Sequence, residues 1–140
     1  MKKLIFSFFL CGATMFPAFS QTYQELSERA VAATEQDSLS LAEKYIEQAL
    51  KMEPANPHNA LLFSNLGTIQ RWQHRYEQAL DSYTLALNIA PRAIPALMNR
   101  AALYLELGKD DLARIDYSLV LDIELSLIHI SEPTRLGMIS

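Results

Sequence analysis

The sequence predicts an all-α protein built from stacked helix–turn–helix repeats. Residues 41–54, 76–91 and 110–124 share one pattern: a small residue, a bulky residue four positions later, and a small or branched residue three positions after that. Steps of four and three place each triplet on one helical face. Prolines punctuate the links between helix pairs, where they cost little. The triplets are Ala42/Ile46/Ala49, Ala79/Tyr83/Ala86 and Ala113/Tyr117/Val120.

The first twenty residues have the features of a cleavable signal peptide. Lys2 and Lys3 form a basic start, and residues 4–16 are almost wholly apolar. Ala18 and Ser20 offer small side chains at the two positions that signal peptidase reads. The apolar run is shorter than the roughly 20 residues of a spanning helix. We expect cleavage before Gln21, an exported protein of the bacterial periplasm or cell envelope, and no membrane insertion afterwards. An uncleaved anchor is the alternative.

Cysteine content and charge narrow the function classes. Cys11, inside the predicted signal peptide, is the only cysteine. The mature chain would contain neither a disulfide nor a thiolate nucleophile, so packing alone must hold it together. Residues 21–124 carry nine basic and fifteen acidic side chains, a net charge of −6. This balance argues against nucleic acid or an anionic membrane surface as a partner.

A second type of helix precedes two of the repeated stretches. Residues 61–72 and 96–107 also show helical spacing, and a short turn follows each. Gly108 closes the latter, because glycine readily adopts the left-handed conformation after a helix. His74-Arg75 serves the former without a glycine. The apolar stripe of the repeated stretches extends to Leu50, Leu87 and Leu121.

These units resemble the tetratricopeptide repeat, a helix–turn–helix unit of 34 residues. The stretch 60–93 matches best: Phe63 stands at the family's tryptophan position and Leu66-Gly67 at its Leu-Gly pair, while Gln70 replaces a tyrosine. Further matches in this unit are Ala79, Tyr83, Ala86 and Pro91.

The other two units match less completely. The unit at 94–124 has Arg100-Ala101 in place of the Leu-Gly pair, and the unit at 23–56 is convincing only in its second helix. A single pair cannot bury its apolar face, so neighbouring pairs must stack. The resemblance therefore implies an α-solenoid fragment of about three repeats, at 23–56, 60–93 and 94–124, the last of them truncated. The third unit keeps Tyr104, Gly108, Ala113 and Tyr117.

The last sixteen residues, "LSLIHISEPTRLGMIS", depart from the repeat. Leu125 stands where the register requires proline, and the helical pattern is expected to stop there. The peptide resembles one translated frame of the transposase end and adapter used in sequencing libraries. We expect residues 125–140 to be a non-native tail fused to a truncated gene. A genuine flexible tail is the alternative.

Catalytic and metal-binding signatures are absent from the sequence. It contains no HExxH, no GxSxG and no glycine-rich phosphate loop. His58 and His74 are expected in solvated turns, and Asp81 and Asp116 on a solvated helix face. We therefore predict no catalytic residue, no metal site and no cofactor.

The resemblance implies that the first helix of each repeat lines a concave groove for a peptide. Asn65 and Asn99 stand 34 residues apart at equivalent places, and an asparagine side chain can pair with both groups of a peptide bond. Arg71 and Arg100 alone do not make a clamp for a carboxylate. The alternative is that the asparagines are family consensus and Trp72 simply packs. The groove-facing positions are Leu61, Ser64, Asn65, Thr68, Arg71, Trp72, Met98, Asn99, Ala102 and Leu105.

We predict a protein–protein interaction scaffold that binds an unidentified protein or peptide in this groove, and not an enzyme. The alternative is the N-terminal repeat region of a larger protein, such as a membrane-anchored signalling receptor or an envelope peptidase. A downstream membrane helix with a kinase or DNA-binding region would indicate the receptor, and HExxH the peptidase.

Overall fold

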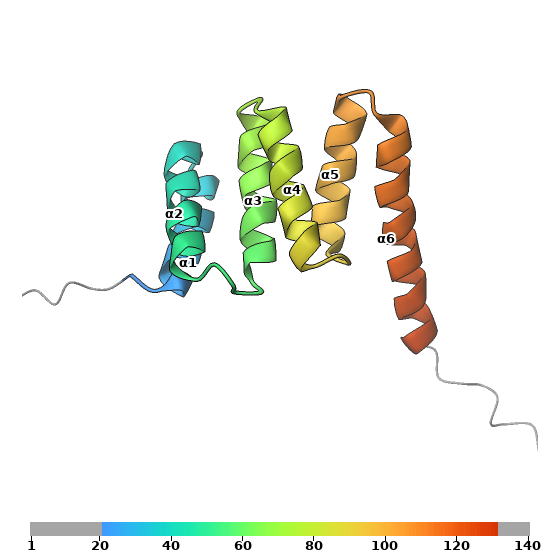
Figure 1. Ribbon diagram of the computed structural model, residues 1–140, viewed down its shortest axis with the longest axis horizontal. Coiled ribbons are helices and arrows are strands. Elements are labelled where there is room, and N and C mark those ends of the chain that lie inside the picture. The colour runs from blue at the N-terminus through green and yellow to red at the C-terminus, as the bar shows by residue number, and fades with distance from the viewer. Residues whose placement is uncertain (1–20, 132–140) are drawn as a thin grey trace, which may run out of the picture.

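The structure is a computed structural model that describes residues 21–131, so the predicted signal peptide and residues 132–140 lie outside the described part. Between residues 21 and 131 every regular element is a helix (Figure 1). The predicted all-α fold of stacked helix pairs is confirmed. The helices are α1 (Tyr23–Glu35), α2 (Leu39–Met52), α3 (Asn59–Trp72), α4 (Tyr76–Ile89), α5 (Ile94–Glu106) and α6 (Asp110–Ser131).

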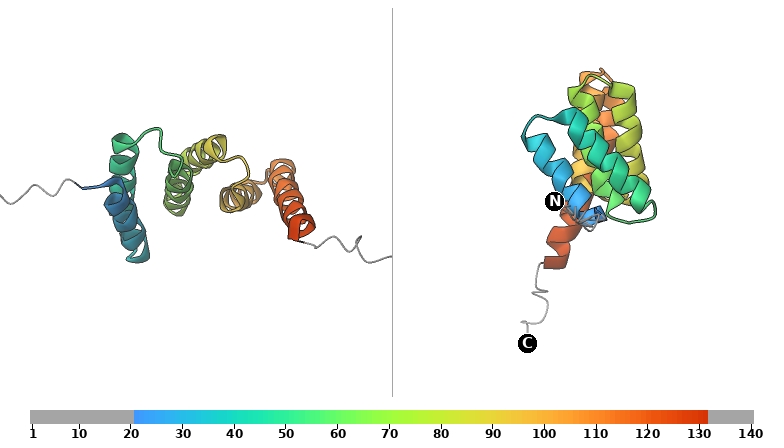
Figure 2. Two further views of the ribbon diagram at one scale, coloured as in Figure 1. Left: turned by 90° about the horizontal axis from the view of Figure 1, so that it is seen from below. Right: turned by 90° about the vertical axis from the view of Figure 1, so that its left-hand side faces the viewer.

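Each odd-numbered helix packs against the even-numbered helix that follows it, and the three pairs stack in chain order. Seen from below, α1, α3 and α5 lie on one side of the stack, with α2 and α4 on the other (Figure 2). We call the surface of α1, α3 and α5 the odd-helix face. It is the face that the resemblance predicts as the groove.

The turns inside the three pairs share one backbone conformation. Asp37, His74 and Gly108 have φ values of 57°, 61° and 69°, which are left-handed. In each turn the next amide donates to the carbonyl five positions earlier at 2.8 Å, which closes the helix end. The turn between α3 and α4 is therefore formed with His74 and without a glycine, as predicted.

The repeated triplets form the core. Eight of their nine residues are buried, and Tyr117 is half-buried. The alanines let a neighbouring helix approach closely, and the bulky residue fills the space beside them. Ile46 and Tyr83 are among the largest fully buried side chains in the described chain. Sequence periodicity therefore located the core residues.

Tyr83 packs directly on Gly67. A Cβ added to Gly67 would lie 2.7 Å from Tyr83 Cε1 and 3.1 Å from the carbonyl oxygen of Ala79. The Tyr83 hydroxyl lies 3.1 Å from Thr68 Oγ1, and the ring is fully buried, so it has little room to move aside. The missing side chain at Gly67 therefore sets how closely α3 and α4 approach.

We expect Gly67→Ala to lower the free energy of unfolding by about 1–2 kcal/mol. Overpacking costs about 1–3 kcal/mol, which outweighs the gain of about 1 kcal/mol from removing a helical glycine. Urea unfolding followed by circular dichroism measures the change. In a Tyr83→Ala background the same substitution should cost far less, because the clash with the ring is gone. A Gly67→Ala chain as stable as the wild type would contradict the close approach.

Helix α6 continues beyond the predicted end of the pattern at position 124. It reaches Ser131, so the expectation that the helical pattern stops with residue 124 is wrong. Residues 125–131 contain neither glycine nor proline, and the next strong helix breaker in the sequence is Pro133. Arg92 Nη2 also donates to Ser126 Oγ at 3.1 Å, which ties this segment to the α4–α5 link. The adapter origin of the tail stays a prediction.

Candidate functional site

The predicted groove residues lie on α3 and α5 and differ in exposure. Trp72 is 54% exposed and Met98 is 43% exposed, so both offer apolar surface to a partner. Ser64 is only 5% exposed, which leaves it little surface for contact. Leu61 and Leu105 are exposed as well. The remaining predicted residues are partly exposed: Asn65, Thr68, Arg71, Asn99 and Ala102.

Three hollows lie between neighbouring helices of the odd-helix face. The first, of about 180 Å³, lies between α1 and α3 and is lined by Val31, Thr34, Glu35, Asn65, Thr68 and Trp72. The second, of about 250 Å³, lies between the starts of α3 and α5, and Leu61, Ser64 and Pro95 contribute to its largely apolar lining. A larger hollow of about 700 Å³ borders the starts of α1 and α3. The face is therefore indented at successive helices.

Arg71 is held in an ion pair that joins α3 to α5. Its Nε donates to Glu106 Oε2 at 3.1 Å, and its Nη2 contacts Oε1 of the same carboxylate. Hydrogen bonding to Arg71 lowers the pKa of Glu106, and the same bond raises the pKa of Arg71. The positive charge of Arg71, a predicted groove residue, is therefore neutralised by a carboxylate of the same chain.

Thr68 connects the odd-helix face to the core. Its hydroxyl lies 3.1 Å from the carbonyl oxygen of Ser64 and 3.1 Å from the Tyr83 hydroxyl. Since Thr68 donates to the carbonyl, Tyr83 donates to Thr68. Burial raises the pKa of Tyr83, which keeps its hydroxyl protonated as a donor. Thr68 thus has its hydrogen bonds satisfied within the chain and holds Tyr83 in place.

Arg100 and Asp116 form a buried ion pair between α5 and α6. Arg100 Nε and Nη2 each donate to one Asp116 carboxylate oxygen at 2.8 Å, and the hydrogen bond raises the pKa of Arg100. Asp116 is 3% exposed, so the expectation that it lies on a solvated face is wrong, whereas Asp81 is exposed as expected. The available sequence signal was Arg100 itself, which replaces an apolar family residue and needs a counter-ion if buried.

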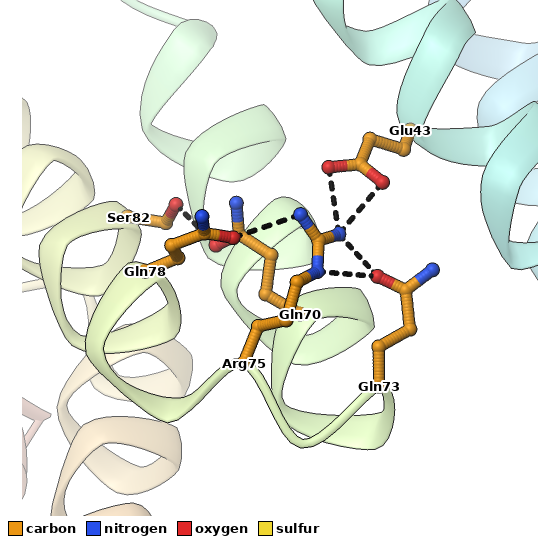
Figure 3. Close-up of polar contacts among 6 residues, drawn as sticks. All are labelled: Glu43, Gln70, Gln73, Arg75, Gln78 and Ser82. Atoms are coloured by element: carbon orange, nitrogen blue, oxygen red, sulfur yellow. Dashed lines mark hydrogen bonds and ion pairs between the residues drawn. The ribbon is translucent and has the colours of Figure 1, made fainter.

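Arg75 makes a second inter-repeat contact that the sequence did not reveal (Figure 3). Its Nη2 donates to both carboxylate oxygens of Glu43 at 2.7 Å, which joins the α3–α4 turn to α2. Nη1 donates to Gln78 Oε1 at 2.8 Å, and Nε to Gln73 Oε1 at 2.9 Å. This network fixes the first two helix pairs relative to each other.

A buried polar contact accounts for Gln70 at the position where the family prefers tyrosine. Ser82 Oγ donates to Gln70 Oε1 at 2.7 Å, and both side chains are buried between α3 and α4 (Figure 3). A buried amide requires such a partner. Gln70 therefore stabilises the helix pair and takes no part in the surface of the groove.

Asn59 fastens the link between the first two pairs. Its side-chain Nδ2 donates to the carbonyl oxygens of Glu53 at 2.8 Å and Pro54 at 3.2 Å. Its Oδ1 accepts from the Tyr23 hydroxyl at 2.9 Å, which brings the start of α1 to the same point. Asn59 is the first residue of α3, so these bonds anchor the start of that helix to α1 and to the α2–α3 link.

Among residues 21–131, no three His, Cys, Asp or Glu side chains are grouped closely enough to hold a metal ion. No helix in that range is both long and apolar enough to cross a bilayer. His58 and His74 are exposed in turns, as predicted. The odd-helix face thus remains the strongest candidate site in this range.

No known family profile matches the chain. Among solved structures, a tetratricopeptide repeat protein from Parabacteroides merdae is 44% identical over 72% of this chain, with a TM-score of 0.68. The chain spans 40% of the length of that protein. The second tetratricopeptide domain of Spaghetti (RPAP3), bound to the HSP90 peptide SRMEEVD, is 23% identical to this chain, with a TM-score of 0.65. The match covers 72% of this chain and 91% of the Spaghetti chain.

A third similar structure supports the same architecture. MamA is 18% identical to this chain, with a TM-score of 0.71, and the match covers 78% of this chain and 62% of MamA. Likeness at such low identity concerns the fold alone, and it agrees with the stack of helix pairs described above. The described part of the chain therefore has the tetratricopeptide-repeat fold, an α-solenoid of three stacked helix pairs.

Proposed function

We propose that the chain is a protein-interaction scaffold that binds a peptide or protein segment on its odd-helix face, without catalysis. The observation that carries this proposal is the combination of exposed apolar side chains, such as Trp72 and Met98, with Asn65 and Asn99 at equivalent repeat positions. Asn65 also lines the hollow between α1 and α3. The Spaghetti domain, which has the same fold, is bound to a peptide. That likeness supports a peptide as the partner class here.

The first experiment selects peptides from a random displayed library with the purified chain. Trp72 is the only tryptophan, so its fluorescence reports occupancy of the odd-helix face directly. Peptides that bind there should lose affinity when Trp72→Ala removes the exposed indole, as measured by calorimetry. If no enriched peptide depends on Trp72, Asn65 or Asn99, the proposed binding face is wrong.

We expect Asn65→Ala and Asn99→Ala each to weaken a selected peptide by about two- to tenfold, because each removes one or two hydrogen bonds to its main chain. Calorimetric titration measures the affinity, and circular dichroism shows whether the stack stays folded. Asn88→Ala, on an exposed position of α4, is the matched control and should bind normally. Unchanged affinity in both groove variants would remove these asparagines from the contact surface.

We further infer that the protein is exported to the bacterial envelope and that residues 125–140 are not native to it. The basic and apolar start of the chain supports export, and the resemblance to adapter sequence supports the second point. The match to only 40% of the Parabacteroides merdae protein supports a longer natural protein. Mass analysis of the secreted chain tests cleavage before Gln21, and sequencing the gene across the codon for Glu124 tests the tail.

A further inference from the structure

The carboxyl end of α1 carries negative charge without a compensating cation. Glu35 is the last residue of α1, and the last turn of this helix contains no basic residue. Asp37 follows in the turn and is exposed. The end of a helix adds a partial negative charge of its own. Among the ion pairs of the described chain, none involves Glu35 or Asp37.

The Glu35 side chain contributes to the hollow between α1 and α3, where the opposite wall is Trp72. The π face of an indole attracts cations, most strongly among the aromatic side chains. Asn65 adds a side-chain amide, whose oxygen can accept from a cation, and Val31 adds apolar surface for an aliphatic stem. A carboxylate, an indole and an amide oxygen around one cavity are the groups that recognise a cationic side chain.

The chain does not fill this hollow with a cation of its own. No Lys or Arg contributes to its lining. The two arginines nearest to Trp72 in sequence are engaged elsewhere: Arg71 pairs with Glu106 and Arg75 pairs with Glu43. The negative potential at the end of α1 is thus available to a partner.

The size of the hollow limits what can enter it. Its volume of about 180 Å³ corresponds to about six water molecules in the liquid, at roughly 30 Å³ each. That space is enough for one extended side chain. A peptide lying along the odd-helix face could therefore insert a single long residue between α1 and α3.

We propose that the hollow between α1 and α3 receives a lysine or arginine side chain of the bound peptide, an inference that rests on the proposed peptide-binding function. The carboxylate of Glu35 pairs with the cation, and the Trp72 indole packs against its aliphatic stem and charge. An acidic peptide such as SRMEEVD, held by the Spaghetti domain, is disfavoured here, because the groove arginine is neutralised by Glu106 and α1 is net acidic.

The test compares three capped peptides that differ at one position: ALARALA, ALAQALA and ALAEALA. Each is titrated into the purified chain while Trp72 fluorescence is recorded. We expect ALARALA to bind about three- to thirtyfold more tightly than ALAQALA, from a cation–π contact plus one ion pair, with ALAEALA weakest. Added salt should reduce the difference, because screening weakens exposed ion pairs.

Two variants assign the effect to the hollow. Glu35→Gln should abolish most of the preference for ALARALA over ALAQALA. Glu28→Gln removes the same charge from the same helix, at a position outside the lining where the carboxylate accepts from Gln24 Nε2 at 3.0 Å, and should keep the preference. Circular dichroism of both variants checks that the helices are unchanged.

Three results would overturn the cation site. Equal affinity for the arginine and glutamine peptides would remove it while leaving the peptide-binding function intact. A preference that persists in Glu35→Gln would place the recognition elsewhere. If none of the three peptides changes Trp72 fluorescence, the hollow has no measurable affinity for a cationic side chain, and the library selection then decides separately whether the face binds peptides at all.

Discussion

Arg100→Ala should lower the free energy of unfolding by about 3 kcal/mol. The substitution leaves the Asp116 carboxylate buried without its partner, and breaking a buried ion pair from one side costs about 3–5 kcal/mol. The lower end applies because the Arg100 side chain keeps 19% exposure. The variant also loses a 3.2 Å bond to Thr84 Oγ1 and a cation–π contact with Tyr104. Urea unfolding of the purified chain measures the loss.

Two comparisons show whether the loss comes from the unpaired carboxylate. Arg114→Ala removes an exposed arginine that lies 3.9 Å from Asp111, and it should leave stability unchanged within error. The double variant Arg100→Leu/Asp116→Ser copies the residues of the second repeat at these positions, Leu66 and Ser82. It should recover most of the stability, since it removes the buried carboxylate together with its partner and leaves no unpaired charge. A single variant as stable as the wild type would disprove the role of the pair.

Leu87→Ala should lower the free energy of unfolding by about 2–4 kcal/mol, whereas Leu121→Ala should change it little. The two leucines occupy the same repeat position, 34 residues apart. Leu87 is 7% exposed and packs with Ala96 and Leu97 of α5, so truncation removes buried contacts and leaves a cavity. Leu121 is 60% exposed, because no helix of the described chain covers that side of α6.

Denaturant unfolding of both alanine variants, measured side by side, tests this asymmetry. A large loss from Leu121→Ala would show that its side of α6 is covered in solution, for example by a second copy, and light scattering would detect that copy. Equal small losses would contradict the packing of α5 on α4. The sequence correctly placed Leu121 on the apolar stripe, but its burial depended on whether another helix follows.

The sequence determined the elements that depend on local chemistry. The small–bulky–small triplets located the core. Their spacing of four and three residues places the side chains on one face of a helix, and this follows from that helix alone. The left-handed turn at His74-Arg75 was predicted from its place after a helical stretch. The continuation of α6 to Ser131 was not predicted, because the apolar periodicity stops at residue 124 although the sequence contains no helix breaker before Pro133.

Part of the candidate site could also be predicted. The tetratricopeptide resemblance selected the exposed Trp72 and Met98, and it aligned Asn65 with Asn99. It did not reveal that Ser64 is nearly covered. It also gave no sign of Glu35, because the hollow that Glu35 shares with Trp72 belongs to two helices from different repeats.

The sequence by itself thus determined the helix pairs, their turns and the core stripe, and it selected the face that we propose for partner binding. Only the tertiary structure decided which charges meet: Arg71 with Glu106, Arg75 with Glu43, and Arg100 with Asp116. The physical reason is that periodicity fixes the direction of a side chain around its own helix. The distance between two side chains on different helices depends instead on how those helices pack, and ion pairs and hollows exist only at such distances.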